Sequence, residues 1–175
     1  MSNKLILLTG LSLLILGSIY AFTMANPVKN TVEETKVKWH TLEEAIELNK
    51  TNKKKFVIDI YTDWCHWCKV MDKETFTDPT VIKYMNEHFY AVKFDGEYKE
   101  NITFQGKEFK FVNAGRRGIN TLAYFLLDGR AAYPTIVYLD EALNKVKISP
   151  GFKKPNQMVA ELKGIESIAT PVAGS

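Results

Sequence analysis

The sequence has few residues of the kinds that bind metal ions. Only two cysteines and three histidines occur among 175 residues, and the histidines are scattered as His40, His66 and His88. A structural zinc site usually has four ligands, and neither a second cysteine pair nor a pair of closely spaced histidines is present. We therefore expect no metal and no cofactor other than the cysteine pair itself.

An excess of charge of one sign is also lacking. The chain has 23 Lys and Arg against 20 Asp and Glu, and the two signs are interspersed. Nucleic-acid binding depends on concentrated positive charge, so we expect no nucleic-acid partner. The one basic cluster, Lys53 to Lys55, is interpreted as a solvated turn. No internal repeat or low-complexity tract is present.

The first 25 residues differ from the rest of the chain. An apolar run over residues 5–19 follows Lys4, and the small residues around Thr23 to Ala25 are typical of a signal-peptidase site. We expect cleavage after Ala25; the alternative is an uncleaved membrane anchor, because the run continues through residue 22 and approaches the roughly 20 residues that span a bilayer. Both interpretations place the folded part outside the cytoplasm, and we expect the periplasm.

The remaining 150 residues have the length of one ordinary domain. Residues 26–38 are polar and aperiodic, and we interpret them as a linker. We expect the folded domain over residues 39–168 and a tail over residues 169–175.

Hydrophobic spacing predicts an α/β domain with helices on both faces of a sheet. The strand at residues 56–61 has apolar residues that do not alternate, as expected of a strand covered on both sides. The helices are expected at residues 42–49, 66–74, 79–88, 121–127 and 156–163. The strands are expected at residues 56–61, 89–95, 135–139 and 145–148, with a hairpin at residues 102–111.

Both cysteines lie in Trp64-Cys65-His66-Trp67-Cys68, between the strand at residues 56–61 and a helical pattern. Two sulfurs separated by two residues on the first turn of a helix can close a disulfide with little backbone movement, and the helix N-terminus stabilises a thiolate. A zinc half-site and a structural clip are the alternatives. A clip that closes so small a loop adds little stability, so we favour redox use.

The sequence resembles the thioredoxin-like superfamily over roughly residues 39–165. The resemblance rests on the strand followed by Trp-Cys-x-x-Cys-Lys and on Tyr133-Pro134-Thr135 before a further strand. The Cys-His-Trp-Cys motif is similar to Cys-x-Trp-Cys thioredoxin-like families and to the C-terminal domain of the thiol:disulfide interchange protein DsbD. The resemblance implies a thioredoxin fold, a central mixed sheet flanked by helices, with a cis-proline loop. The sequence departs from that pattern by an inserted hairpin and helix before this loop.

The resemblance also implies roles for three residues near the motif. Cys65 corresponds to the attacking thiol and Cys68 to the buried resolving thiol. Asp59, six residues before Cys65, stands where thioredoxins place a buried carboxylate that accepts a proton from the resolving thiol. An acid within an apolar strand is unfavourable unless it has a partner, and burial raises its pKa. The alternative is a solvated aspartate at the sheet edge.

The expected substrate-binding residues surround the cysteines. Pro134 corresponds to the cis-proline that faces the disulfide, and the backbone of Tyr133 would pair with a bound substrate segment. We expect Trp64 to cover the disulfide; a half-buried structural tryptophan is the alternative. His66 and Trp67 lie between the sulfurs, and a protonated histidine there can stabilise the Cys65 thiolate.

The sequence therefore predicts a monomeric protein-disulfide oxidoreductase that acts on cysteines of extracytoplasmic proteins through a mixed disulfide at Cys65. Reduction is favoured over oxidation, and a reductase needs an electron donor, which we expect in the membrane. Two other functions stay open: a non-catalytic module that binds peptides or proteins, and a metal carrier that uses Cys65, His66 and Cys68. The residues between 96 and 132 form an insertion that either selects a partner or caps the sheet edge.

Overall fold

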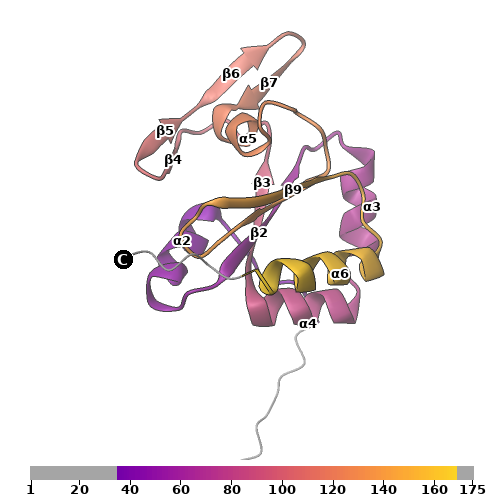
Figure 1. Cartoon of the computed structure of the whole chain (residues 1–175). Helices are drawn as coiled ribbons and strands as arrows, with labels where there is room; N and C mark the ends of the chain where they lie inside the picture. Colours follow the sequence, from indigo (N-terminus) through magenta and orange to yellow (C-terminus); the bar gives the residue numbers. More distant parts are fainter. Residues whose placement is uncertain (1–34, 169–175) are drawn as a thin grey trace, which may run out of the picture. The chain divides into compact units, whose positions relative to one another are not determined.

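The structure is a computed structural model, and it describes residues 35–168 (Figure 1). The expected signal peptide or anchor at residues 1–25, most of the expected linker and the tail at residues 169–175 lie outside this range. Within the described residues, no helix has both the length and the apolar character needed to cross a membrane.

A five-stranded mixed sheet forms the centre of the domain, in the order β1-β3-β2-β8-β9. Strands β1, β2 and β3 are parallel, and β8 and β9 are antiparallel to their neighbours. The strand bounds are β1 Trp39–His40, β2 Lys55–Tyr61, β3 Phe89–Asp95, β8 Thr135–Leu139 and β9 Lys145–Pro150. The four longer strands confirm the expected positions, whereas the two-residue strand β1 was not expected.

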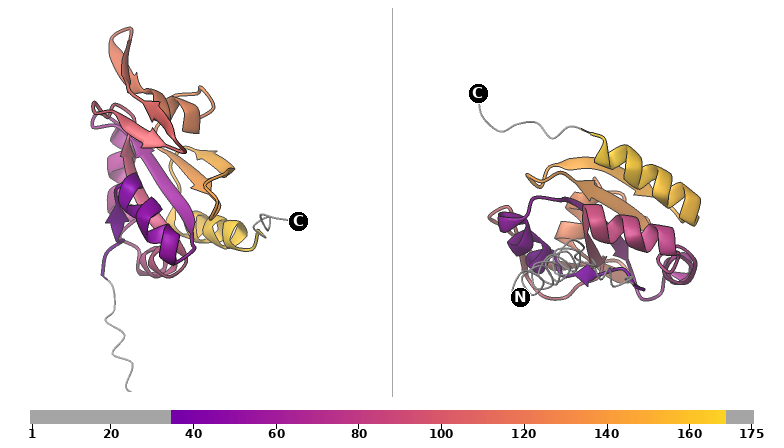
Figure 2. Two further views of the ribbon diagram at one scale, coloured as in Figure 1. Left: turned by 90° about the vertical axis from the view of Figure 1, so that its left-hand side faces the viewer. Right: turned by 90° about the horizontal axis from the view of Figure 1, so that it is seen from below.

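Helices cover both faces of this sheet, as the sequence predicts (Figures 1 and 2). One core includes Phe56, Ile58 and Ile60 of β2 together with side chains of α2 and α5. The other includes Val57 and packs α3, α4 and α6, of which α4 and α6 lie side by side in both figures. The helix bounds are α2 Leu42–Thr51, α3 His66–Glu74, α4 Pro79–His88, α5 Thr121–Leu126 and α6 Pro155–Glu166.

Local capping signals explain where α2 and α4 begin. Thr41 and Glu44 form a capping box in which each side chain accepts a hydrogen bond from the other residue's backbone N–H. Asp78 caps α4 by accepting hydrogen bonds from two backbone N–H groups, and Pro79 occupies the first helical position. These short-range signals are the reason that the expected starts of both helices are correct.

The segment between β3 and β8 contains a second hairpin in addition to the expected hairpin and helix. The expected hairpin is present as β4 (Ile102–Phe104) and β5 (Lys107–Phe109), with positive φ at Gln105 and Gly106 in the turn. The expected helix is α5. A second hairpin, β6 (Phe111–Ala114) and β7 (Arg117–Asn120), was not predicted, because the sequence there does not alternate between apolar and polar residues.

Three further expectations need correction or refinement. The last helix continues beyond residue 163, through Gly164, to Glu166. Lys55 does not lie in a solvated turn: it belongs to β2, is 6% exposed, and its ammonium group donates hydrogen bonds to backbone carbonyls at the end of α6. Val37, within the expected linker, is buried, and its neighbours are hydrogen-bonded to Asn86 of α4.

Candidate active site

The cysteine pair lies at the junction between the end of β2 and the start of α3. The backbone N–H of Cys65 donates to the carbonyl of Thr62 (3.0 Å), which turns the chain into the helix. Cys65 is the N-cap of α3, and its sulfur accepts a hydrogen bond from the backbone N–H of Cys68 (3.1 Å). The two sulfurs form a disulfide, with the Cα atoms 5.3 Å apart. The helix N-terminus thus points at the sulfur of Cys65, where its N–H groups stabilise negative charge.

Both cysteines are almost fully buried, and exposed aromatic rings stand beside them. Cys65 is 4% exposed and Cys68 is 2% exposed, whereas Trp64 and Trp67 are 47% and 56% exposed. Trp67 packs on Phe152, with 5.6 Å between the ring centres. The exposed surface next to the cysteines is therefore largely aromatic.

The Tyr133-Pro134 peptide bond is cis, as the sequence predicts. Pro134 is buried and leads directly into β8, and its carbonyl accepts a hydrogen bond from the N–H of Gly151 (2.8 Å). The rings of Tyr133 and Trp64 are nearly perpendicular, with 5.8 Å between their centres, so the proline loop and the cysteine motif are in contact. Tyr133 also fills the space beside Gly96, where an added Cβ would lie 2.5 Å from the tyrosine oxygen.

Asp59 is buried within β2, as expected, and is 1% exposed. Its Oδ2 atom lies 3.4 Å from the ammonium nitrogen of Lys93, which stands beside it on β3. Lys93 also forms an ion pair with Asp72 of α3, so the lysine is shared between two carboxylates. The second oxygen, Oδ1, has no hydrogen-bond partner among the described residues, and the same holds for the hydroxyl of Thr62.

This environment favours the protonated form of Asp59. Burial is the largest cause and raises the pKa of the Asp59 carboxyl to about 7, because a charge is unfavourable where water is excluded. The positive charge of Lys93 lowers this pKa, and the negative charge of Asp72 raises it. A carboxyl group with a pKa near neutrality can both accept and release a proton under physiological conditions.

The insertion contacts the site through two residues that the sequence analysis did not assign to it. Glu97, just beyond β3, accepts a hydrogen bond from the indole N–H of Trp64 (3.0 Å). The guanidinium of Arg117 in β7 lies over the Trp64 ring, with its carbon 4.2 Å from the ring centre. The arginine pair at 116 and 117 is visible in the sequence as a cluster of charge, but no sequence signal indicates that it faces Trp64.

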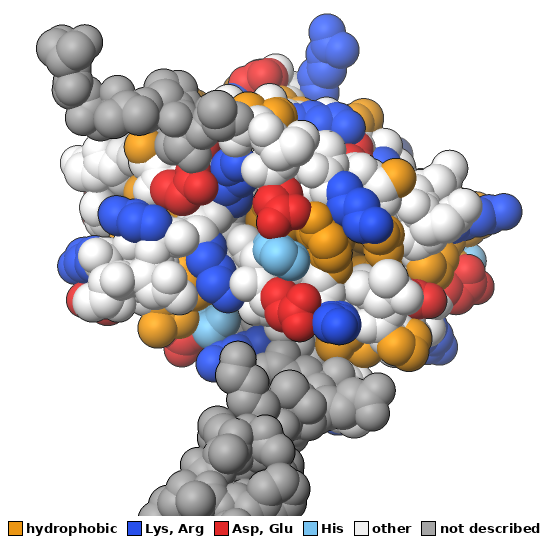
Figure 3. All heavy atoms as spheres, turned by 60° about the horizontal axis from the view of Figure 1, so that its bottom comes forward, with side chains coloured by type: hydrophobic (Ala, Val, Ile, Leu, Met, Phe, Trp, Pro, Cys, Tyr) orange, Lys and Arg blue, Asp and Glu red, His pale blue; other side chains and the backbone are white. Residues whose placement is uncertain are grey.

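Two hollows lie elsewhere on the domain. One, of about 290 Å³, is lined by residues 52–55, residues 87–89, Glu141 and Glu166, at the amino end of β2, opposite the end that leads to the cysteines. In the face turned forward in Figure 3, acidic and basic side chains are interspersed around a histidine, so neither sign of charge dominates. The other, of about 530 Å³, lies within the insertion between β5 and α5.

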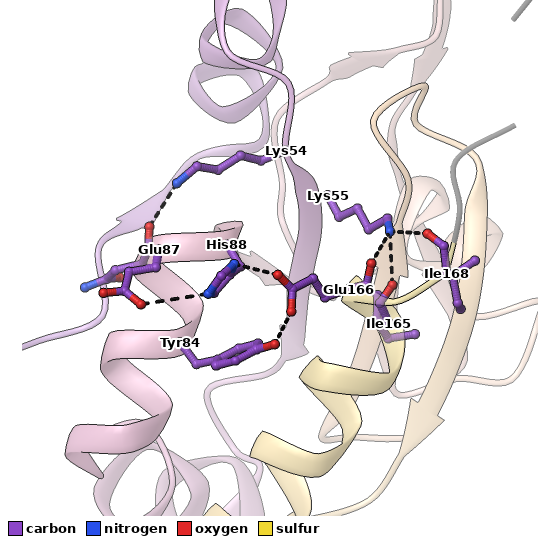
Figure 4. Close-up of polar contacts among 9 residues, drawn as sticks. Lys54, Lys55, Tyr84, Glu87, His88, Ile165, Glu166 and Ile168 are labelled. Atoms are coloured by element: carbon purple, nitrogen blue, oxygen red, sulfur yellow. Dashed lines mark hydrogen bonds and ion pairs between the residues drawn. The ribbon is translucent and has the colours of Figure 1, made fainter. Parts of the chain in front are cut away.

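Figure 4 shows that polar contacts at the first hollow join α4, α6 and β2. Glu166 accepts a hydrogen bond from Tyr84 and pairs with His88 (2.8 Å). The ammonium group of Lys55 donates to the carbonyls of Ile165 (3.1 Å), Glu166 (2.9 Å) and Ile168. Glu166 thus bonds to two side chains of α4, and Lys55 bonds to the backbone at and just beyond the end of α6, so these contacts join the three elements.

Among residues 35–168, no group of three or more His, Cys, Asp and Glu side chains is placed to hold a metal ion. His66 is exposed and its ring lies 5.8 Å from that of Trp67. The two sulfurs are bonded to each other.

The comparisons with known proteins agree with this geometry. A family model, Thioredox_DsbH, described as a protein of unknown function, DUF255, matches residues 23–164. The uncharacterized protein B0495.5 of Caenorhabditis elegans is 32% identical over 76 residues, which are 43% of this chain and 10% of that protein. The thiol:disulfide interchange protein DsbD of Vibrio vulnificus strain CMCP6 is 38% identical over 65 residues, which are 35% of this chain and 11% of that protein.

The chain thus spans about a tenth of the length of these relatives. A solved structure described as the DsbH oxidoreductase resembles this domain with a TM-score of 0.56 at 15% identity, covering 83% of this chain and 96% of that chain. At that identity the likeness concerns the fold. The strand order, the cysteine helix and the cis-proline loop have the arrangement that the thioredoxin resemblance implies.

Proposed function

The chain belongs to the thioredoxin-like DsbH (DUF255) family, and we propose that this thioredoxin-like disulfide oxidoreductase exchanges its Cys65–Cys68 disulfide with cysteines of extracytoplasmic proteins. The observation that carries the proposal is the disulfide at the N-cap of α3, whose outer sulfur accepts a backbone hydrogen bond. A purely structural clip would not need a buried carboxyl group in the strand that leads to it, and Asp59 supplies one.

In the reducing direction, the thiolate of Cys65 attacks one sulfur of the partner's disulfide. A bond forms between Cys65 and that sulfur, and the partner's other sulfur leaves as a thiolate. Cys68 then loses its proton to Asp59 and attacks the Cys65 sulfur, which releases the partner's second sulfur. The partner gains two electrons, and the protein is left with the Cys65–Cys68 disulfide.

We propose reduction as the working direction, with a membrane-bound dithiol protein as the donor that restores the two thiols. The Trp-Cys-x-x-Cys-Lys motif supports this direction, and the similarity to DsbD, a protein named for thiol:disulfide interchange, supports the exchange chemistry itself. The apolar run at residues 5–19 supports an extracytoplasmic location, and a periplasmic one would keep the domain near such a donor.

The test is reduction of insulin by dithiothreitol, with the wild-type protein and the variants Cys65→Ser and Cys68→Ser. We expect catalysis by the wild type and its loss in both variants. Cys68→Ser should also trap partner proteins in a mixed disulfide at Cys65, because the second attack is missing. A reduction rate that Cys65→Ser leaves unchanged would contradict the proposal and would favour a non-catalytic binding module.

Selective alkylation tests whether Cys65 is the attacking thiol and Cys68 the resolving thiol. The sulfur of Cys65 faces the N-terminus of α3, and Cys68 lies one turn into the helix. The reduced protein should therefore be alkylated first at Cys65 near neutral pH. Equal labelling of the two cysteines, measured by peptide mass spectrometry, would argue against these roles.

A further inference from the structure

The inserted hairpin contributes a charged residue to the rim of the disulfide site. Arg117 lies over the face of Trp64, the residue directly before Cys65. Trp64 is held at two further points, by the hydrogen bond to Glu97 and by the T-shaped contact with the Tyr133 ring. A partner segment bound beside Cys65 therefore comes within reach of the insertion.

Buried contacts hold this hairpin in place independently of Arg117. Asn120, at the end of β7, is fully buried, and its side-chain amide donates to the carbonyls of Tyr98 (3.0 Å) and Glu100 (3.3 Å). Its backbone N–H donates to the carbonyl of Gly96 (2.8 Å). The position of the hairpin is thus fixed from its base, and a substitution at the exposed Arg117 should leave the fold intact.

The tip of the hairpin carries positive charge that the rest of the described domain does not neutralise. Residues 111–120 contain two arginines and no acidic residue. Arg116 and Arg117 are both exposed, and neither forms an ion pair within residues 35–168. A guanidinium that stacks on an aromatic ring keeps the N–H groups at its edge available, and these fit a carboxylate with two parallel hydrogen bonds.

We propose that Arg117, assisted by Arg116, binds a carboxylate of the partner protein that lies close to the cysteine attacked by Cys65. This inference rests on the proposed function and names the substrate class: disulfides flanked by Asp or Glu. Two acidic residues also lie near Trp64. Glu97 accepts a hydrogen bond from the indole N–H of Trp64, and Asp63, which directly precedes Trp64 in the sequence, is exposed. A preference for a basic partner, attracted by these acids, is the opposite outcome.

The experiment uses three disulfide-containing peptides that differ only at the residue after the cysteine, which is Glu, Gln or Lys. The measured quantity is kcat/KM for exchange by the wild type and by Arg117→Lys, Arg117→Gln, Arg117→Glu and the double variant Arg116→Gln/Arg117→Gln. An exposed charge pair changes such rates modestly, so we expect the wild type to prefer the Glu peptide over the Gln peptide by about two- to fivefold at low salt. High salt should reduce the preference.

Arg117→Lys should retain part of the preference, Arg117→Gln should reduce it, and Arg117→Glu should shift it toward the Lys peptide. The Gln peptide is the reference within each variant, so a change in exchange that does not depend on the charge of the peptide cancels in the ratio of the two rates. Equal rates with all three peptides, a wild-type preference for Lys, or a Glu preference that survives in the double variant would overturn the inference alone. Absence of exchange with every peptide would overturn the proposed function and the inference with it.

Discussion

Replacing Asp59 with Asn should change how the stability of the protein depends on pH. In the folded state Asp59 is 1% exposed, and its pKa is raised from 3.8 to about 7, chiefly by burial. In the unfolded chain the same carboxyl group is in water and loses its proton near its ordinary pKa. Asn has nearly the same shape but no charge at any pH.

The sign and size follow from proton linkage. Between about pH 4 and pH 7 the folded protein holds a proton on Asp59 that the unfolded chain has released, so stability decreases as the pH rises. The stability that comes from this raised pKa is therefore fully present when the pH is below the unfolded-state pKa of Asp59, and it is lost once the pH has risen to the folded-state pKa. A difference of roughly three pKa units corresponds to about 4 kcal/mol, and above pH 7 this contribution no longer changes.

The assay is urea denaturation of the oxidised wild type and of Asp59→Asn at a series of pH values from 4 to 8. The disulfide keeps both cysteines from titrating, and all other groups are common to the two proteins. We expect similar free energies of unfolding near pH 4, and an advantage for the Asn variant that grows to about 4 kcal/mol by pH 8.

The control is Asp128→Asn, which removes an exposed carboxylate that pairs with Lys145. This variant should follow the wild-type pH dependence within about 0.5 kcal/mol. A free-energy difference between Asp59→Asn and the wild type that varies by less than about 1 kcal/mol from pH 4 to pH 8 would refute the raised pKa, and with it the reason to regard Asp59 as a proton acceptor near neutrality.

Two further substitutions test contacts at opposite ends of the domain. Lys55→Met should lower the free energy of unfolding by about 1–3 kcal/mol in thermal or urea denaturation, because two carbonyls at the end of α6 and the carbonyl of Ile168 just beyond it lose a charged donor. Lys53→Met, at an exposed site, should change the free energy of unfolding little, and equal effects of the two substitutions would contradict this role of Lys55. Gly96→Ala should displace the Tyr133 ring, lower stability by about 1–3 kcal/mol and slow insulin reduction. Gly164→Ala, in an open helical position, should raise stability by about 1 kcal/mol with normal activity, and a normal rate in Gly96→Ala would show that the placement of Tyr133 does not matter for exchange.

The elements that the sequence predicted are those with local signals. The start of α4 follows from Asp78 and Pro79, and strand β3 has the expected bounds, residues 89–95. The hairpin β6–β7 lacks such a signal. Gly118 is needed there because an added Cβ would lie 1.8 Å from a ring carbon of Phe111 on the facing strand. That requirement depends on the pairing of two strands and is not visible in either one alone.

In the site, too, the residues that lie close together in the sequence were predicted, and those brought together only by folding were not. The cysteines and the buried aspartate lie within ten residues of one another, so their pattern could be recognised. Glu97 and Arg117 were missed because only tertiary folding brings them to Trp64, over a sequence separation of 33 residues in the case of Glu97. The burial of Lys55 was missed for a similar reason, since its carbonyl partners stand 110 or more residues away.

The two ends of strand β2 differ in how fully their buried polar groups are hydrogen-bonded. At its amino end, the buried charge of Lys55 is satisfied by three carbonyls, an arrangement that stabilises the junction with α6. At its carboxyl end, Asp59 Oδ1 and the Thr62 hydroxyl are buried without a hydrogen-bond partner in the described part of the chain, which is unfavourable. A carboxylate whose lone pairs were all occupied could not take up a further proton easily. The unpaired oxygen of Asp59 is therefore what the proposed proton transfer from Cys68 requires, and the well-satisfied contacts at the other end of the strand help the fold to tolerate it.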